Sequence, residues 1–171
     1  MTVNPRLTLV LGGARSGKSA HAEGLIGAHA PPWIYIATAQ AFDDEMRARI
    51  ETHRARRDAR WRTLDAPHDL AEAIALAPLA PLLIDCLTLW LSNRMLAGAD
   101  LARERQDLVA VLEARQAPTV AVSSEVGLSI VPENALARAF RDAAGELHQA
   151  VARIAGAVTL TVAGCPLRVK G

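Results

Sequence analysis

The feature that most constrains the fold is the stretch Gly12–Ser19, which has the pattern Gly-X4-Gly-Lys-Ser. It follows the apolar run Leu7–Leu11 and leads into a segment with helical character. A strand, a glycine-rich turn and a helix in this order are the context in which the pattern forms a phosphate-binding P-loop. Gly12, Gly13 and Gly17 allow backbone conformations that a Cβ would forbid, so several amide groups can face one anion. The sequence therefore predicts a site for a nucleoside triphosphate.

Single residues of this motif have predicted roles. Lys18 would reach the outer phosphates as a catalytic cation, and the Ser19 hydroxyl would hold Mg²⁺. The alternative for the motif alone is an ordinary glycine-rich turn. Lysine usage favours the P-loop, because the chain has 19 Lys+Arg but lysine only at Lys18 and Lys170, and a compact ammonium suits a phosphate. The nucleotide-binding residues expected here are Gly12, Gly13, Ala14, Arg15, Ser16, Gly17, Lys18 and Ser19.

Composition excludes several other classes of protein. The chain has 171 residues, 51% of them hydrophobic and 22% charged, which is typical of one globular domain spanning residues 1–171. The formal net charge of +1 gives no general attraction to nucleic acid or to an anionic membrane. Cys86 and Cys165 have neither metal-binding nor redox spacing, which fits a reducing compartment. No membrane span and no signal peptide are recognisable, so a cytoplasmic protein is expected.

Strand-like apolar runs alternate with helical segments along the chain. The predicted strands are Leu7–Leu11, Trp33–Ala37, Trp61–Asp65, Pro81–Asp85, Thr119–Ser123 and Ala157–Ala163, and Pro166–Lys170 could add an edge strand. The predicted helices are Lys18–His29, Asp43–Arg57, Asp69–Ala77, Leu87–Ala97, Leu101–Arg115 and a segment from Leu136 to Ile154. This alternation predicts an α/β fold, a P-loop NTPase-like three-layer sandwich around a mostly parallel sheet.

Residues at the ends of two other strands should line the same crevice as the P-loop, because ligands of open α/β sheets bind outside the carboxyl ends of the strands. Ala37, Thr38 and Ala39 end the second strand in this way. Asp85 ends a continuously apolar strand, which is the Walker B form that delivers a carboxylate to Mg²⁺ or its water. The alternative is that Asp85 only caps the next helix.

The segment Asp43–Arg57 is crowded with charge and poor in apolar residues. On spacing alone, a solvated charged helix is the more common explanation. The segment also contains His53, whose neutral imidazole could attack a phosphorus centre and form a phosphoramidate, while the arginines could neutralise phosphate charge during transfer. A nucleic-acid surface is disfavoured, because acids interrupt the arginines and no aromatic platform accompanies them. The residues alone leave the first two explanations open.

Further stretches of the sequence are distinctive when they are taken together with the P-loop. They are Ile36–Ala39, Asp43–Met46, Arg49–Arg54, Trp61–Asp65, Asp85–Thr88, Glu125–Gly127 and Ile130–Asn134. Through them the chain from Leu7 to Lys170 resembles the bifunctional adenosylcobinamide kinase / adenosylcobinamide-phosphate guanylyltransferase family of cobalamin biosynthesis. Glu125–Gly127 with Ile130–Asn134 is the strongest part of this resemblance after the P-loop, and together the stretches are far more specific than a P-loop alone.

The resemblance implies two reactions on one corrinoid. A nucleoside triphosphate, ATP or GTP, phosphorylates the terminal hydroxyl of the aminopropanol arm of adenosylcobinamide. GMP then passes from GTP to that phosphate through a guanylylated histidine, which gives adenosylcobinamide-GDP and pyrophosphate. By resemblance the nucleophile is His53 and the assembly is a homotrimer. The P-loop and Walker B patterns, as above, assign Mg²⁺ to Ser19 and Asp85. The nucleotide contacts implied beyond the P-loop are Ala37, Thr38, Ala39, Arg54, Ala55, Arg56, Arg57, Asp65 and Asp85.

The chain departs from the family pattern at four positions. Asp65 and Asp85 stand where glutamates occur in some members, Ser124 replaces an asparagine and Ser129 replaces a glycine. None of these changes removes a nucleophile or a phosphate-binding group, so both activities are expected. Val126–Val131 is the expected wall of the corrinoid cleft. Two rival functions are a plain P-loop small-molecule kinase without a covalent intermediate and a nucleotide-binding regulatory module without an acceptor.

Overall fold

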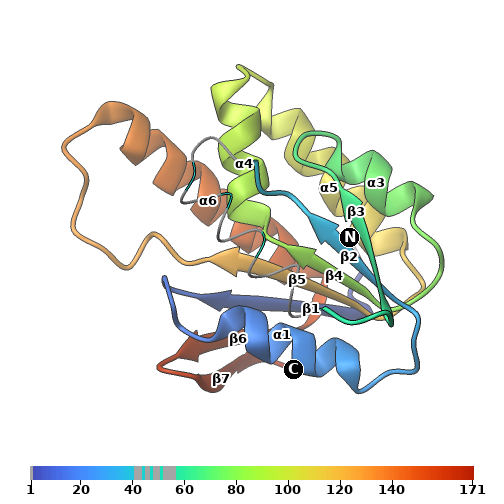
Figure 1. Cartoon of the computed structure of the whole chain (residues 1–171). Coiled ribbons are helices and arrows are strands. Elements are labelled where there is room, and N and C mark those ends of the chain that lie inside the picture. The colour runs from blue at the N-terminus through green and yellow to red at the C-terminus, as the bar shows by residue number, and fades with distance from the viewer. Residues whose placement is uncertain (1, 41–43, 45–46, 48–50, 52–56) are drawn as a thin grey trace.

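The computed structural model describes residues 2–40, 44, 47, 51 and 57–171, and strands and helices alternate along it (Figure 1). The strands are β1 Asn4–Gly12, β2 Trp33–Ala37, β3 Trp61–Asp65, β4 Leu82–Asp85, β5 Thr119–Ser124, β6 Ala155–Val162 and β7 Cys165–Lys170. The helices are α1 Lys18–Gly27, α3 Leu70–Leu76, α4 Leu87–Leu96, α5 Leu101–Ala114 and α6 Ala135–Ile154. Most of the helix predicted over Asp43–Arg57 lies outside the described residues, so that prediction is untested.

The strands form one seven-stranded sheet in the order β3-β2-β4-β5-β1-β6-β7. All neighbouring pairs are parallel except β6 and β7, which form an antiparallel hairpin at the sheet edge. The carboxyl ends of β1, β4 and β5 therefore lie side by side, with Gly12 paired to Ser124 and Asp85 paired to Val122. The predicted α/β fold with a mostly parallel sheet is confirmed.

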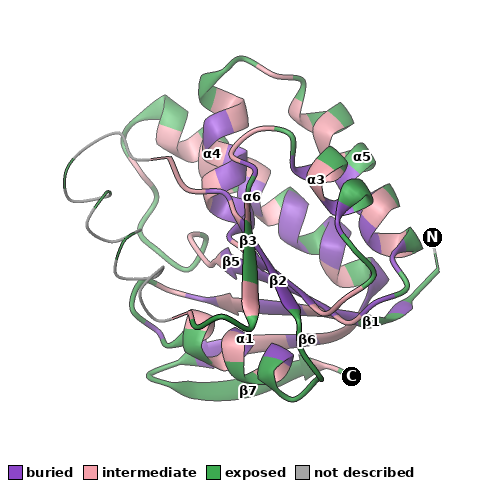
Figure 2. Cartoon of the chain, turned by 45° about the vertical axis from the view of Figure 1, so that its right-hand side comes forward, coloured by how far each residue is buried: buried purple, intermediate pink, exposed green. Residues whose placement is uncertain are grey.

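Both faces of the central strands are covered by helices, which explains their continuous apolar sequences. In β1, Leu9 faces the cluster shared with α3–α6, whereas Val10 faces α1; both residues are fully buried. In the same way Leu83 packs on the α1 side and Ile84 on the opposite side. Figures 1 and 2 show the resulting layers, with α1 on one face of the sheet and α3–α6 on the other. None of the described helices combines the length and the apolar character needed to cross a membrane.

Two strands begin two or more residues before their predicted starts. β1 begins at Asn4 rather than Leu7, and β6 begins at Ala155, directly after α6. Asn4 pairs with Ala155, and its buried amide donates to the carbonyls of Leu112 and Arg115 at 2.8 and 2.9 Å. A polar residue that would be unfavourable in a core strand is thereby satisfied, and it ties the start of the sheet to the end of α5.

Arg115 follows α5 and is only 6% exposed. Its guanidinium donates to the carbonyls of Ile74, Ala77, Pro78 and Ala80, where α3 ends and the chain turns toward β4. Five donors on a planar group allow one side chain to satisfy this whole set of carbonyls. Arg115 is thus the link that holds the α3–β4 connection against α5.

Arg115→Met is expected to lower the free energy of unfolding by about 3 kcal/mol, because buried carbonyls lose their charged donor while the apolar stem is kept. Urea unfolding followed by circular dichroism measures this change. Arg103→Met is the matched control, since the Arg103 side chain is 80% exposed and 3.8 Å from Asp107; a change below about 1 kcal/mol is expected there. Equal effects of the two substitutions would show that the Arg115 hydrogen bonds add no net stability.

Candidate active site

The P-loop joins β1 to α1 at the carboxyl edge of the sheet. A Cβ on Gly12 would lie 2.4 Å from Ser16 Oγ and 2.8 Å from the Thr161 carbonyl oxygen, so only glycine fits there. Gly17 has φ of 91°, in the left-handed region that favours glycine. Gly13 differs from the expectation, because its φ is not positive and a Cβ on it would meet no atom within 4 Å. Within the described structure, neither the backbone conformation nor the packing at position 13 requires a glycine.

The turn between β6 and β7 supports this loop from the side. Gly164 donates its N–H to the Ser16 carbonyl at 2.8 Å, and its Cα lies 3.1 Å from the position of a Cβ on Gly17. Ala163 and Gly164, with φ of 52° and 79°, form the tight turn that brings the chain there. The edge hairpin, although distant in sequence, fixes the backbone of the P-loop.

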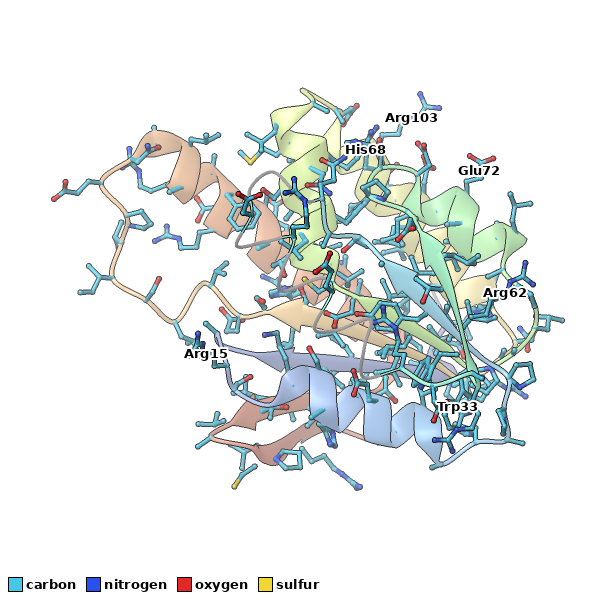
Figure 3. All side chains as sticks on the ribbon, in the orientation of Figure 1. Arg15, Trp33, Arg62, His68, Glu72 and Arg103 are labelled. Carbon is cyan, nitrogen blue, oxygen red and sulfur yellow. The ribbon has the colours of Figure 1, made fainter. Side chains whose placement is uncertain are left out.

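Positive charge gathers where α1 begins. Gly17 caps the helix without a side-chain hydrogen bond, and the first turn carries no acidic residue. The amides of that turn and the helix dipole therefore favour an anion in front of the loop. Lys18 Nζ donates to the Gly13 carbonyl at 3.2 Å, which holds the ammonium across the loop. Arg15 is exposed and projects from the P-loop, whereas Trp33 lies at the opposite end of the sheet (Figure 3).

Hydroxyl groups connect the ends of β2, β4 and β5. The Thr38 hydroxyl donates to the Cys86 carbonyl and accepts from the Cys86 N–H, both at 2.8 Å, and the Ser124 N–H donates to Thr88 Oγ1 at 2.9 Å. Thr38 is fully buried, so its side chain positions the crevice rather than facing it. Ala37 and Ala39 beside it are partly exposed, and their predicted contacts with a nucleotide remain predictions.

Cys86 lies next to Asp85, but its chemistry is suppressed. Burial raises the pKa of the Cys86 thiol to about 11, and the Asp85 charge adds to the effect. A thiol with this pKa is protonated near neutral pH and is a poor nucleophile. Cys86 is therefore part of the packing under the site.

Asp85 extends from the end of β4 and is oriented by an aromatic residue. Tyr35 donates its hydroxyl to Asp85 Oδ2 at 3.0 Å, and the Arg57 guanidinium lies 3.7 Å from the centre of the Tyr35 ring. The pKa of Tyr35 is raised far above its usual value, chiefly by burial and then by the Asp85 charge, so the phenol stays a donor. Arg57 Nη1 is buried without a hydrogen-bond partner among the described residues. Tyr35 thus contacts both residues: its ring packs against Arg57 and its hydroxyl binds Asp85.

Asp65 belongs to a different part of the edge. Strand order places Asp85 two strands from the P-loop, about 10 Å, and Asp65 four strands from it, about 19 Å. Asp65 borders a hollow of about 230 Å³ together with His68, Asp69 and Glu72. His68 Nε2 lies 2.8 Å from Gln40 Nε2. Asp65 and the P-loop are therefore too far apart to contact the same phosphate, and the predicted contact of Asp65 with a nucleotide stays a prediction.

The sequence does not predict a role for His148, whose side chain lies beside the end of β5. His148 lies on the buried face of α6, with Nε2 2.7 Å from Ser123 Oγ and Nδ1 3.6 Å from Glu125 Oε2. Burial lowers the pKa of His148, and the Glu125 charge opposes that change. From the sequence His148 is an ordinary member of an amphipathic helix. Only the fold brings it to the end of β5.

The segment between β5 and α6 carries exposed apolar side chains. Leu128, Ile130 and Val131 are 82%, 93% and 62% exposed. The segment extends away from the sheet before α6 begins (Figure 1), and Asn134 caps that helix by accepting from the N–H groups of Leu136 and Ala137. Within the predicted corrinoid wall Val126–Val131, these three side chains are apolar and accessible, whereas Val126 is partly buried against the core.

Four predicted site residues lie outside the described part of the chain. They are His53, Arg54, Ala55 and Arg56. Their roles as nucleophile and as phosphate contacts remain predictions. Arg57 is described, and its position beside Tyr35 shows that the chain reaches the α1 face of the sheet directly after them.

Comparisons with known proteins agree with this geometry. A family model described as cobinamide kinase / cobinamide phosphate guanyltransferase matches residues 8–169. The "Bifunctional adenosylcobalamin biosynthesis protein CobP" of Pseudomonas aeruginosa is 48% identical over 167 residues, covering 95% of this chain and 96% of that protein. The "Bifunctional adenosylcobalamin biosynthesis protein CobU" of Salmonella typhimurium is 43% identical over 181 residues, covering 96% and 99%.

A solved structure also shares the fold. The protein titled "Structural study of Project ID PH0250 from Pyrococcus horikoshii OT3" matches with a TM-score of 0.53 and 9% identity, covering 100% of this chain and 88% of that one. This likeness concerns the fold alone. The family match, by contrast, spans the P-loop, Asp85 and the β5–α6 segment. The chain therefore belongs to the cobinamide kinase / cobinamide phosphate guanyltransferase family and is a bifunctional kinase and guanylyltransferase.

Proposed function

We propose that this chain phosphorylates the terminal hydroxyl of adenosylcobinamide with a nucleoside triphosphate and then transfers GMP from GTP to the new phosphate through a guanylylated His53. The observation that carries the proposal is the formed P-loop at the same edge of the sheet as Asp85, in a chain whose residues 8–169 match the family model. The products of the second reaction are adenosylcobinamide-GDP and pyrophosphate. The family match excludes the rival of a regulatory module without turnover.

Nucleotide binding relies on groups that need little rearrangement. The amides at the start of α1 receive the phosphates, and Lys18 moves its ammonium from the Gly13 carbonyl onto the outer ones. Phosphoryl transfer depends mainly on positioning and charge neutralisation. A loop fixed by Gly12, Gly17 and the β6–β7 turn supplies that positioning.

Residues present in the site fit Mg²⁺. Asp85 provides a carboxylate oriented by Tyr35, and Ser19 provides a hydroxyl one residue after Lys18. The described residues contain no cluster of three or more His, Cys, Asp or Glu side chains that could hold a metal alone. Mg²⁺ is usually bound by one or two protein oxygens together with substrate phosphates. When bound, the ion would neutralise charge on the transferred phosphate.

The guanylyl transfer is a two-step displacement. A ring nitrogen of His53 forms a bond to the α-phosphorus of GTP, and the bond to the bridging oxygen breaks with its electron pair leaving on pyrophosphate. A phosphate oxygen of the acceptor then forms a bond to the same phosphorus and releases the imidazole. Arg57, held at Tyr35, belongs to the arginine-rich segment that would balance the charge of these steps.

The proposal also includes a binding surface for the corrinoid acceptor and a number of copies in the assembly. The exposed apolar side chains between β5 and α6 offer a surface for the corrinoid ring. Resemblance to the family further implies that three copies form the working enzyme. A corrinoid bound elsewhere on the molecule would remove the β5–α6 segment from this proposal.

Product analysis tests the proposed reactions. The purified chain is incubated with Mg²⁺, GTP and adenosylcobinamide, and the corrinoid products are separated and identified by their masses in a mass spectrometer. We expect first the phosphate ester and then the GDP derivative. Accumulation of the phosphate ester alone would favour the plain kinase. If the corrinoid stays unchanged while GTP is bound, the proposal is wrong.

A further inference from the structure

Glu125 is the first residue after β5, and its backbone places it at the P-loop. Its N–H donates to the Gly12 carbonyl at 2.9 Å. β5 lies between β4 and β1 in the sheet, so Glu125 emerges between Asp85 and the P-loop. A residue at this position is next to the space in which the outer phosphate of a bound nucleotide meets its acceptor.

One hydrogen bond and one longer contact define the position of the Glu125 carboxylate. Oε1 accepts the N–H of Gly127, and Oε2 lies 3.6 Å from His148 Nδ1. His148 is itself fixed, because its Nε2 lies 2.7 Å from Ser123 Oγ and the residue is only 7% exposed. A Cβ on Gly127 would lie 2.9 Å from Glu125 Oε1, so glycine there leaves room for the carboxylate.

One tautomer of His148 satisfies both neighbours. With the proton on Nδ1, the ring points a donor at Glu125 and offers Nε2 as acceptor to the Ser123 hydroxyl. In the described structure Glu125 is the charged group that acts on the ring, and Ser123 is its polar partner from β5. Burial favours the neutral ring. The unit Ser123–His148–Glu125 therefore orients a carboxylate and leaves lone pairs free, since a carboxylate accepts about four hydrogen bonds.

We propose that Glu125 is the general base of the kinase reaction and that His148 positions it. The acceptor hydroxyl oxygen forms a bond to the γ-phosphorus, and its proton passes to the Glu125 carboxylate. The bond between the γ-phosphorus and the bridging oxygen breaks, with its electron pair leaving on the nucleoside diphosphate. The Glu125 side chain is 20% exposed, so the proton can leave to solvent. This inference rests on the proposed function.

The proposal separates the two reactions of the enzyme. Phosphorylation of an alcohol requires a proton acceptor, whereas guanylyl transfer to a phosphate that is already ionised does not. A base used only in the first reaction can therefore be recognised by a selective loss. General bases contribute typically about 10²–10⁴-fold to the rate.

Glu125→Gln tests the base, and Glu146→Gln is the matched control. Glu146 is on the same helix as His148, but its side chain is 62% exposed and pairs with Arg105 at the surface. Both variants are assayed for phosphorylation of adenosylcobinamide and, separately, for guanylyl transfer to prepared adenosylcobinamide phosphate. We expect Glu125→Gln to lower the kinase kcat about 100-fold or more, with the KM for the nucleotide and the second reaction within about threefold of the wild type. Glu125→Asp should recover part of the lost kcat.

His148→Gln tests the positioning role. It is expected to lower the kinase kcat by about tenfold without raising the KM for the nucleotide, because the carboxylate loses orientation but remains present. Circular dichroism melts confirm folding of each variant. Equal loss of both reactions in Glu125→Gln, or an unchanged kinase kcat, would overturn the assignment while the wild type still makes both products. A wild type that phosphorylates no corrinoid would overturn the proposed function as well.

Discussion

Lys18→Ala is expected to lower the kinase kcat/KM by about 10²–10³-fold, because a cation aimed at the developing phosphate charge is lost. Lys18 Nζ lies across the P-loop at the Gly13 carbonyl, and the loop backbone itself stays intact without the side chain. Guanylyl transfer should fall with it if both reactions use this one nucleotide site. Initial rates with varied GTP, together with calorimetric titration of GTP, separate the loss of rate from the loss of binding.

The second lysine of the chain is the natural control. Lys170 Nζ donates to the carbonyls of Ala152 and Arg153, at the opposite end of the sheet from the P-loop. Lys170→Ala should leave both activities unchanged and lower the stability slightly. Retention of full kinase activity in Lys18→Ala would contradict the assignment of the P-loop as the phosphate site.

His53→Ala is expected to abolish guanylyl transfer while phosphorylation of adenosylcobinamide persists. The covalent route needs the imidazole as nucleophile, and an alanine side chain cannot form the bond to phosphorus. The kinase reaction uses the P-loop and an alcohol acceptor instead. Product analysis by mass spectrometry should find that the corrinoid stops at the phosphate ester.

His29→Ala is the matched control for this substitution, because His29 is exposed and its hydrogen bonds with Trp33 and Ile26 use backbone atoms. It should give the GDP derivative at the wild-type rate. If His53→Ala still forms adenosylcobinamide-GDP, the nucleophile lies elsewhere. If it loses both reactions and keeps its fold, His53 acts in nucleotide binding rather than in a covalent step.

Local sequence patterns predict most of the fold. The strands Trp33–Ala37 and Trp61–Asp65 have the predicted bounds, because the first is an apolar run after Pro31-Pro32 and the second is an alternating pattern that ends before Ala66-Pro67. The early starts of β1 and β6 escape prediction, since they depend on the pairing of Asn4 with Ala155 and on carbonyls at the end of α5. The position of β5 between β4 and β1 is likewise a property of the assembled sheet.

Some residues of the candidate site can likewise be predicted from sequence, and others cannot. Sequence places the P-loop and Asp85 at the carboxyl ends of their strands, where the structure has them, because each pattern occupies a few consecutive residues. Their roles stay predictions. Tyr35 and His148 are missed, because their roles come from contacts with Asp85 and with Ser123 and Glu125 that lie far away in the chain. Thr38 is found at the correct edge, but its hydroxyl binds Cys86. The role of His53 depends on residues that the structure does not describe, and it stays a prediction.

The most direct test of the central claim uses GTP labelled at the α-phosphate. The wild type and His53→Ala are incubated with this GTP and Mg²⁺, denatured, and examined for label on the chain. The account predicts a label that is labile in acid, stable in base and absent from the variant, as expected for a phosphoramidate on an imidazole. A folded wild type that binds GTP but gains no label, or a variant that gains as much, would contradict it.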